Sequence, residues 1–521
     1  MTSTDPRRWW GLGFISVAVS LIIVDSTIVN VAVPAIVTDL GISSTEVQWV
    51  QEVYTLVFAS LLLLFGATAD RIGRRRALLT GVAVFAGASV AAAFAPTGGL
   101  LILARTVQGV GGALILPATL SLLNAGFRGR ERTIAFAVWG STIGGMAAVG
   151  PLLGGWLTTS FSWRWAFGIN VPLGILVLVG VLATVRESRE TSARIDLVGS
   201  ALSVVLFGAL VFALIEGRTF GWWTAEDGIE LGPVKWTATI SPVPIALALS
   251  ASALVLLLIW SRARARRARP ALLDLSLFRV PTFARGNLVA LVVALGEFGI
   301  ILSLPLWLQF VQGFDALQTG LVLLALAIGS FGASGLIGAL SARVRPVIVV
   351  RAGLLAEIVG IVGVALALGS GAGWGWLIPT LFVYGFGVGL ATAQLTGVIL
   401  ADVPVERSGQ ASGTQSTARQ VGSALGIAIL GTVLFTGTGA TLSSSLDDAG
   451  VDAGARDAVV SRVVDSAGAA ISSLDGDEIA LAEEAFTTGT QLSAFTAAGF
   501  LAIGFAASFG LGSARREQQP A

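Results

Sequence analysis

Long apolar runs separated by short polar segments make up most of this chain. Each run spans roughly 20 residues, the length that a helix needs to cross the hydrocarbon core of a bilayer. The pattern predicts an all-α membrane protein with fourteen transmembrane helices. The predicted spans are about 11–34, 47–67, 77–96, 100–124, 133–158, 165–185, 196–216, 240–260, 284–308, 317–341, 347–369, 374–400, 412–436 and 491–511.

Arginines are concentrated in alternate loops between these runs. Basic residues in short loops mark the cytoplasmic side of a membrane. The alternation therefore orients every span and places both termini in the cytoplasm, which requires an even number of spans. The basic loops are at residues 7–8, 71–76, 128–132, 186–194, 262–269, 343–345, 407 and 515–516.

Two long polar segments stand out from the other loops. Residues 437–490 hold ten acidic side chains and are expected outside the cell, most simply as a solvated acidic loop. The alternative is a small cap over the exit, built from amphipathic helices at 455–471 and 477–486. Residues 261–282 contain six arginines and predict an interfacial amphipathic helix on anionic lipid.

Related motifs recur in two parts of the chain. Gly338-Ala-Leu-Ser-Ala-Arg follows the tenth span much as Gly66-Ala-Thr-Ala-Asp-Arg follows the second. Repeated helical halves are typical of alternating-access transporters. We therefore predict a six-helix bundle at 1–190, and two inserted helices with a basic cytoplasmic linker at 191–282. A second six-helix bundle at 283–521 would carry the acidic loop.

Composition excludes several kinds of chemistry. The chain has no cysteine and no histidine, so it offers neither disulfides nor metal sites built from those two residues, and we expect no metal site. Lys235 is the only lysine and is not part of a Walker A phosphate loop. A net charge of +1 gives no reason to expect a nucleic-acid partner. Proton chemistry would fall to aspartate and glutamate.

Several motifs then follow one another in a familiar order. Residues 66–78 read Gly-Ala-Thr-Ala-Asp-Arg-Ile-Gly-Arg-Arg-Arg-Ala-Leu, and span one contains Asp25-Ser-Thr-Ile-Val-Asn-Val-Ala-Val-Pro. Span four contains Arg105-Thr-Val-Gln-Gly-Val-Gly-Gly, and span five contains Gly150-Pro-Leu-Leu-Gly-Gly. With its fourteen spans, the chain resembles the fourteen-helix drug:proton antiporters of the major facilitator superfamily. The resemblance implies export driven by the proton gradient, with no other cofactor.

Polar residues at membrane depth are the candidates for coupling. Asp25 lies midway along an apolar helix, where an ionised carboxylate must be paired or protonated. We interpret it as a proton or cation site; a structural hydrogen-bonding role is the alternative. Arg105 cannot discharge and needs a partner, and the resemblance links it to proton coupling. Asn30 and Gln108 would line the same cavity or hold helices together.

The second half offers further candidates. Glu297 and Glu357 lie within apolar runs, and we expect them to take part in proton coupling. Trp307 suits the cavity or an aromatic belt, and Arg419 needs a buried carboxylate that the sequence does not identify. The full set expected to line the substrate cavity is Asn30, Gln108, Asn170, Trp307, Gln309, Gln312 and Arg419.

Two motifs are expected to serve movement and packing rather than binding. In the loop at 66–78, Asp70 would meet a helix N-terminus or an arginine in one conformation only, as a latch; topology marking is the alternative. The latch residues are Gly66, Asp70, Arg71, Gly73 and Arg74. The span-five motif predicts a kinked helix pressed against a partner. Its residues are Gly144, Gly150, Pro151, Gly154 and Gly155.

These observations together predict an exporter of amphipathic, cationic small molecules in a bacterial cytoplasmic membrane. Its partners would be the substrate, protons and membrane lipids, and we expect a monomer. An exporter of an endogenous lipid, antibiotic or metabolite with the same fold is the alternative. We do not expect an enzyme, because no paired catalytic residues are found, and a receptor would leave the antiporter motifs unexplained.

Overall fold

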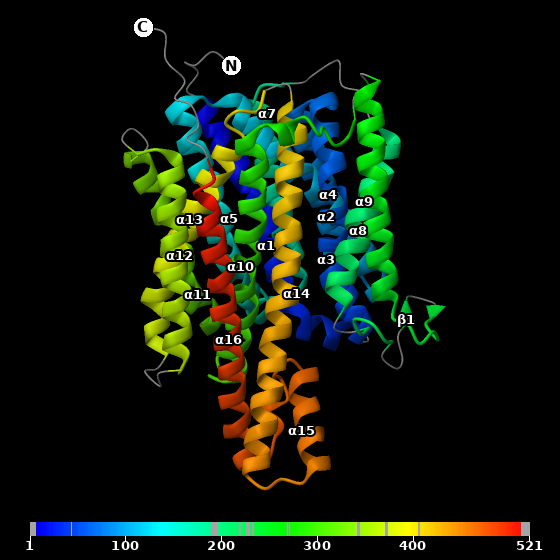
Figure 1. Ribbon diagram of the computed structural model, residues 1–521, viewed down its shortest axis with the longest axis vertical. Coiled ribbons are helices and arrows are strands. Elements are labelled where there is room, and N and C mark those ends of the chain that lie inside the picture. Colours follow the sequence, from blue (N-terminus) through cyan, green and yellow to red (C-terminus); the bar gives the residue numbers. More distant parts are fainter. Residues whose placement is uncertain are drawn as a thin grey trace.

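The computed structural model describes residues 7–511, except 43, 189–195, 218–219, 226–229, 232–233, 268, 270, 341–343, 370–373 and 405–406. Within these ranges the chain is almost entirely helical (Figure 1), which confirms the predicted all-α class. The exception is a hairpin of two short strands, β1 (Glu230–Leu231) and β2 (Val234–Lys235).

The first six predicted spans form one bundle. Its helices are α1 (Arg7–Leu40), α2 (Ser44–Ile72), α3 (Arg74–Ala93), α4 (Gly98–Gly126), α5 (Gly129–Ser160), α6 (Arg164–Gly168) and α7 (Asn170–Thr184). The sixth predicted span is thus divided into two helices, α6 and α7, at Ile169. Within the bundle α1 packs on α5 and α7, while α3 packs on α4.

The last six predicted spans form a second bundle of similar design. Its helices are α10 (Pro281–Phe310), α11 (Ala316–Leu340), α12 (Pro346–Gly369), α13 (Leu377–Ile399), α14 (Ser408–Asp448) and α16 (Asp477–Ser508). The first helix packs on the fifth and the third on the fourth, as in the N-terminal bundle. The two halves therefore share a packing scheme as well as the sequence motifs noted above.

Two further helices, α8 (Leu197–Glu216) and α9 (Pro242–Arg266), lie between the halves in sequence. They pack on each other along one edge of the bundle (Figure 1). Each begins at a polar cap: Asp196 accepts a hydrogen bond from Gly199 N, and Ser241 accepts one from Val243 N, both at 3.1 Å. Because α8 contacts both α2 and α14, the pair covers a seam between the two halves.

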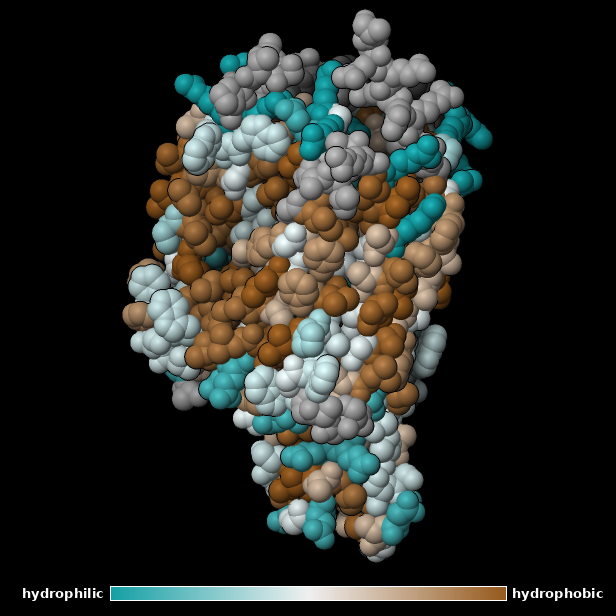
Figure 2. Space-filling view, turned by 90° about the vertical axis from the view of Figure 1, so that its left-hand side faces the viewer, coloured by the Kyte–Doolittle hydropathy of each residue, from teal (hydrophilic) through white to brown (hydrophobic). Residues whose placement is uncertain are grey.

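The helices are long and apolar enough for a multi-pass membrane protein. In the described part of the chain, eleven helices pass this test, or twelve with α5, which bends by 45° between Met146 and Val149. The two other predicted spans are α10, of 30 residues, and α11, of 25 residues. The exact count of fourteen stays a prediction. The surface shows an apolar band between polar ends (Figure 2).

The acidic segment 437–490 folds into helices. We call the face where α1 begins and α16 ends the terminal face, and the opposite face the far face (Figure 1). Beyond the far face, α14 and α16 continue and form a projection with α15 (Ala453–Asp465). Leu446, Val463 and Phe486 are fully buried in it. The expectation of a solvated loop is therefore wrong, and the alternative of two helices there is closer to the structure.

The predicted interfacial helix at 261–282 is also wrong. Residues 261–266 instead belong to the last turns of α9. The chain then reaches α10 through irregular turns and a short 3-10 helix, η1 (Leu277–Arg279). Asp196 helps to hold this segment because it accepts hydrogen bonds from Trp260 Nε1 at 2.9 Å and Leu272 N at 3.2 Å. Tertiary contacts to a buried carboxylate thus replace a regular lipid-facing helix.

The two halves are closed together at the terminal face. At the end of α4, Asn124 Nδ2 donates to Ser408 Oγ at the start of α14, at 2.7 Å. On α13, Gln394 Nε2 donates to the backbone oxygen of Thr133 on α5, at 3.3 Å. Helices α5 and α11 pack along the other seam between the halves. Opening of the terminal face requires that these polar contacts break.

Candidate functional site

Asp25 is the centre of a buried polar network in the N-terminal half. Its carboxylate is completely buried on α1 and forms a salt bridge with Arg105 Nη1 on α4. Two amides also donate to Asp25 Oδ1: Gln108 Nε2 at 3.0 Å and Asn170 Nδ2 at 2.7 Å. Three donors thus stabilise the ionised carboxylate of Asp25. Their hydrogen bonds compensate for the water contacts that it loses inside the bundle.

Arg105 is held on several sides. Its Nε donates to the backbone oxygen of Val50 at 3.2 Å, and its Nη1 also donates to Gln108 Oε1 at 3.0 Å. The guanidinium lies 4.5 Å from the ring centroid of Tyr54, in a cation–π contact. These contacts fix the position of the Arg105 guanidinium, so that it can pair with the carboxylate of Asp25 on α1.

Ser89 completes this network from α3. Its hydroxyl oxygen accepts from Gln108 Nε2 at 2.8 Å and Asn170 Nδ2 at 3.3 Å. We call Asp25, Ser89, Arg105, Gln108 and Asn170 the N-terminal charge site. The sequence pointed to all of them except Ser89, because a serine in an apolar helix carries no signal that separates it from a packing residue.

A second network lies in the C-terminal half. Glu297 on α10 accepts from Arg419 Nη2 on α14 at 3.1 Å and from Thr392 Oγ1 on α13 at 2.9 Å. The buried carboxylate that Arg419 needs is therefore Glu297. The hydroxyl of Tyr384 donates to the backbone oxygen of Glu297 at 3.1 Å. Both predicted carboxylates of this half gather here, since Glu357 lies within electrostatic range of Glu297 and Arg419.

We call Glu297, Glu357, Tyr384, Thr392 and Arg419 the C-terminal charge site. Like its N-terminal counterpart, it pairs a carboxylate on the first helix of the half with an arginine from a later helix. The two sites differ in charge: the N-terminal one has one carboxylate for its arginine, whereas the C-terminal one has two.

The remaining cavity candidates do not join either charge site by any contact among the described residues. Trp307 is buried, and its Nε1 donates to Thr487 Oγ1 on α16 at 2.8 Å, which ties α10 to α16. Gln309 is half-buried, and Gln312 is exposed beyond the end of α10. The side chain of Asn30 lies outside the described residues.

The latch candidates between α2 and α3 occupy different environments. Gly66 lies against the start of α14, and a Cβ added to it would be 2.7 Å from the Cα of Gly413. Arg71 is exposed, Arg74 is buried, and the side chain of Asp70 lies outside the described residues. The glycine therefore allows two helices from opposite halves to touch at the terminal face.

A carboxylate that the sequence reasoning missed meets the N-terminus of α3. Glu187, which follows α7, accepts hydrogen bonds from the backbone nitrogens of Arg75 and Arg76, each at 3.1 Å. A carboxylate is favourable there because the first amides of a helix have no partners within it. The preceding Gly73 has φ 109°, a left-handed conformation suited to glycine. No local pattern links Glu187 to a helix more than 100 residues earlier.

The glycines of α5 allow close packing on both sides. A Cβ added to Gly150 would collide with Thr27 Oγ1 on α1, and one added to Gly144 would lie 2.6 Å from Ser330 Oγ on α11. A larger residue at either position would crowd the contact with the neighbouring helix. The other residues of this motif are Pro151, Gly154 and Gly155, all within α5.

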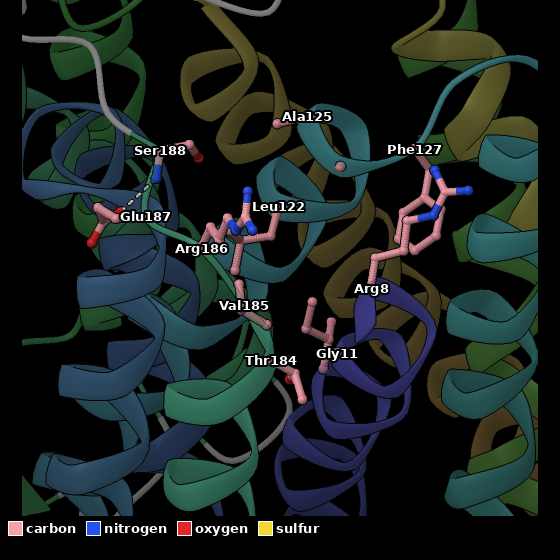
Figure 3. A pocket seen from close by; sticks show the side chains of 12 residues that line it. Arg8, Gly11, Leu122, Ala125, Phe127, Thr184, Val185, Arg186, Glu187 and Ser188 are labelled. Atoms are coloured by element: carbon pink, nitrogen blue, oxygen red, sulfur yellow. Dashed lines mark hydrogen bonds between the residues drawn. The ribbon is translucent and has the colours of Figure 1, made fainter. Parts of the chain in front are cut away.

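A small pocket of about 160 Å³ opens at the terminal face (Figure 3). It lies between the start of α1, the end of α4 and the chain after α7, and Arg8, Phe127 and Glu187 are among its lining residues. Arg8 lies over the Phe127 ring, at 5.8 Å from its centroid, and pairs with Glu131. These partners already engage the charged groups of the pocket.

Two helical bundles of one packing scheme, each with a buried ion pair and joined at one face, define a membrane transporter of the alternating-access type. The family model of the Major Facilitator Superfamily matches residues 15–427, and this chain belongs to that superfamily.

Similar proteins cover nearly the whole chain. The multidrug resistance protein Stp of Mycobacterium tuberculosis is 32% identical over 94% of this chain and 89% of its own length. The tetracenomycin C resistance and export protein of Streptomyces glaucescens is 30% identical over 95% of this chain and 90% of its own. The crystal structure of the human organic anion transporter MFSD10 has the same fold, with a TM-score of 0.61 at 14% identity, covering 97% of this chain and 100% of that one.

Proposed function

We propose that this protein is a proton-coupled antiporter that exports amphipathic, cationic small molecules by alternating access. The observation that carries the proposal is the completely buried salt bridge between Asp25 and Arg105. A carboxylate in such a place binds either a proton or a cation, and exchange between them needs no covalent step. The relative from Mycobacterium tuberculosis, named as a multidrug resistance protein, supports export of drugs.

Protonation would change the N-terminal charge site directly. A proton on Asp25 removes the negative charge that holds Arg105, so the salt bridge loses its Coulombic part and α1 and α4 are free to shift. Loss of the proton restores the bridge. Proton binding is thereby linked to helix arrangement, and we assign the coupling role to Asp25, Arg105, Glu297 and Glu357, with the proton gradient as the energy source.

Orientation follows from the arginines. We propose that the terminal face is cytoplasmic, because the basic loops of the sequence lie on this side and positive charge is retained there in short loops. The structure then corresponds to a state closed toward the cytoplasm, and the helical projection extends outward from a bacterial cytoplasmic membrane. Substrate would leave on the far side, and protons would enter from there.

The test uses purified protein in proteoliposomes that contain a pH-sensitive dye. Ethidium, a quaternary ammonium compound, a zwitterionic antibiotic and a lipid analogue are added in turn. Proton flux triggered by ethidium is expected for the wild type and is expected to disappear in Asp25→Asn. Proton-driven transport at the wild-type rate in Asp25→Asn would contradict the assignment.

Asp39→Asn is the matched control, since it makes the same change near the far end of the same helix. Asp39 is partly exposed and accepts from Arg164 Nη1 at 2.6 Å. This hydrogen bond, with a second from Trp163, holds the pKa of Asp39 below its ordinary value. The control removes a surface ion pair, so its proton flux should stay close to that of the wild type.

A second function has support from a different relative. The Streptomyces protein, named for resistance to and export of tetracenomycin C, favours an exporter of one endogenous antibiotic, lipid or metabolite. The same panel separates the two functions. Flux with several unrelated cations supports a multidrug exporter, whereas flux confined to the antibiotic or the lipid analogue supports the narrower function.

A further inference from the structure

Glu357 is in an unusual environment for a carboxyl group. It is completely buried on α12, and neither of its side-chain oxygens has a hydrogen-bond partner among the described residues. The helix α13 packs directly on it, since a Cβ added to Gly387 would lie 2.8 Å from Glu357 Cγ. An ionised carboxylate without a single donor is among the most costly groups to bury.

The groups that face Glu357 come from three helices. Glu297 on α10 and Arg419 on α14 are close enough to interact with it electrostatically. Tyr384 on α13 also lies near it, but its hydroxyl donates to the backbone of Glu297 instead. On α16, which also packs on α12, the acidic residues are confined to the far-face end. Arg351, on α12 itself, donates to the Ser508 oxygen on α16.

Charge balance then separates the two glutamates. Glu297 has two donors, Arg419 at 3.1 Å and Thr392 at 2.9 Å, so its ionised form is well supported. A negative charge on Glu357 as well would leave two carboxylates with one guanidinium in a buried site. A single proton on Glu357 makes the site neutral and removes the charge that has no donor.

We propose that the C-terminal half contains its own proton-binding site, in which Glu357 holds the proton while Glu297 stays ionised beside Arg419. The inference rests on the proposed function, because it gives that antiporter a second proton site besides Asp25. Arg419 decides where the proton lies: the carboxylate that it contacts is charged, and the other one is protonated.

Infrared spectroscopy of the full-length protein at pH 7, in a maltoside detergent that has no carbonyl group, tests this directly. A protonated carboxyl group has a C=O stretching band that a carboxylate lacks. We expect this band in the wild type and its loss in Glu357→Gln, whose amide mimics the neutral acid in shape. Asp25→Asn is the matched control in the other half and should retain the band. A band that persists unchanged in Glu357→Gln overturns the proposal.

Two more variants separate Glu357 from Glu297. Thr392→Val removes a donor to Glu297 only, so the band position should not change; a shift would place the proton on Glu297 and overturn the assignment. Arg419→Gln removes the cation, so both glutamates should become protonated and the band should grow about twofold. An unchanged band there contradicts the charge-balance argument. No transported compound is used, so failure of ethidium export would count against the proposed function alone.

Discussion

At the scale of single residues, the arginines of the two charge sites differ in how firmly they are held. Arg105 is fixed by Val50, Gln108 and the Tyr54 ring as well as by Asp25. Arg419 is partly exposed, at 13% of its side chain, and serves a site with two carboxylates. The N-terminal pair is therefore fixed by further contacts besides its salt bridge, whereas the arginine of the C-terminal pair is only partly buried.

The Asp25–Arg105 bridge can be tested by a double-mutant cycle. Asp25→Asn and Arg105→Gln each leave one buried charge without its partner, so each should lower the melting temperature of the purified protein. The double variant removes both charges and should be less destabilised than the sum of the two, by about 0.5–3 kcal/mol. Thermal unfolding in detergent measures the destabilisation of each single variant and of the double variant relative to the wild type. Additive effects would mean that the two groups do not stabilise each other.

Part of each charge site was predictable from the sequence because a charged or amide side chain in an apolar run is conspicuous. Asp25, Arg105, Glu297 and Arg419 all carried that signal. Ser89 and Thr392 did not, since hydroxyl groups are common in membrane helices and often bond to their own backbone. The partner of Arg419 was also beyond the sequence, because it depends on which helices face each other in space.

At the scale of elements, the start of α3 depends on a residue from another part of the chain. Arg75 and Arg76 offer free amides to Glu187, and the backbone nitrogen of Arg74 donates to the Ser188 oxygen at 2.9 Å. The α2–α3 loop is thus tied to the segment that leads from the N-terminal bundle to α8. A movement of either segment must therefore break these hydrogen bonds or move the other segment with it.

Removal of this cap should loosen the first turn of α3. In Glu187→Ala the amides of Arg75 and Arg76 lose their acceptor, and a typical cap contributes about 1 kcal/mol. Their hydrogen exchange should therefore become about fivefold faster. Glu187→Gln keeps one acceptor oxygen and is expected to lie between the two. Exchange rates measured by mass spectrometry check this. Identical rates in the wild type, Glu187→Ala and Glu187→Gln would show that Glu187 does not cap α3.

Element boundaries were hardest to predict where helices leave the membrane. The sequence predicted an end near residue 436, where apolar residues thin out, yet α14 continues to Asp448. Beyond the membrane a helix needs only a narrow apolar stripe, here represented by Leu442 and Leu446, both fully buried. The end of α9 was mispredicted for the same reason: α9 continues to Arg266, whereas its last arginines were assigned to a separate lipid-facing helix.

At the scale of the whole molecule, the contact between Asn124 and Ser408 reports which face is closed. The chain has no cysteine of its own, so a pair of introduced cysteines has no competing thiols. In Asn124→Cys/Ser408→Cys, oxidation should join α4 to α14 and stop ethidium export, and reduction should restore it. Gel mobility after protease cleavage between the halves measures the cross-link. Export that continues in the fully cross-linked protein would show that the terminal face need not open.

Asn124→Cys alone is the control for this experiment. It loses the hydrogen bond to Ser408 but cannot form the cross-link, so oxidation should leave its export unchanged. A fall in export on oxidation of this single variant would point to damage of another kind. The comparison therefore separates a locked face from a weakened one.

The length of α14 has a mechanical consequence. Its 41 residues form a helix about 60 Å long, roughly twice the thickness of the hydrocarbon core. Its end at the terminal face touches the opposite half, and its other end forms part of the projection. A tilt of about 10° about the end at the terminal face would move the opposite tip by about 10 Å. The projection must therefore move whenever α14 tilts at the terminal face, and a molecule bound to its tip would restrict that tilt.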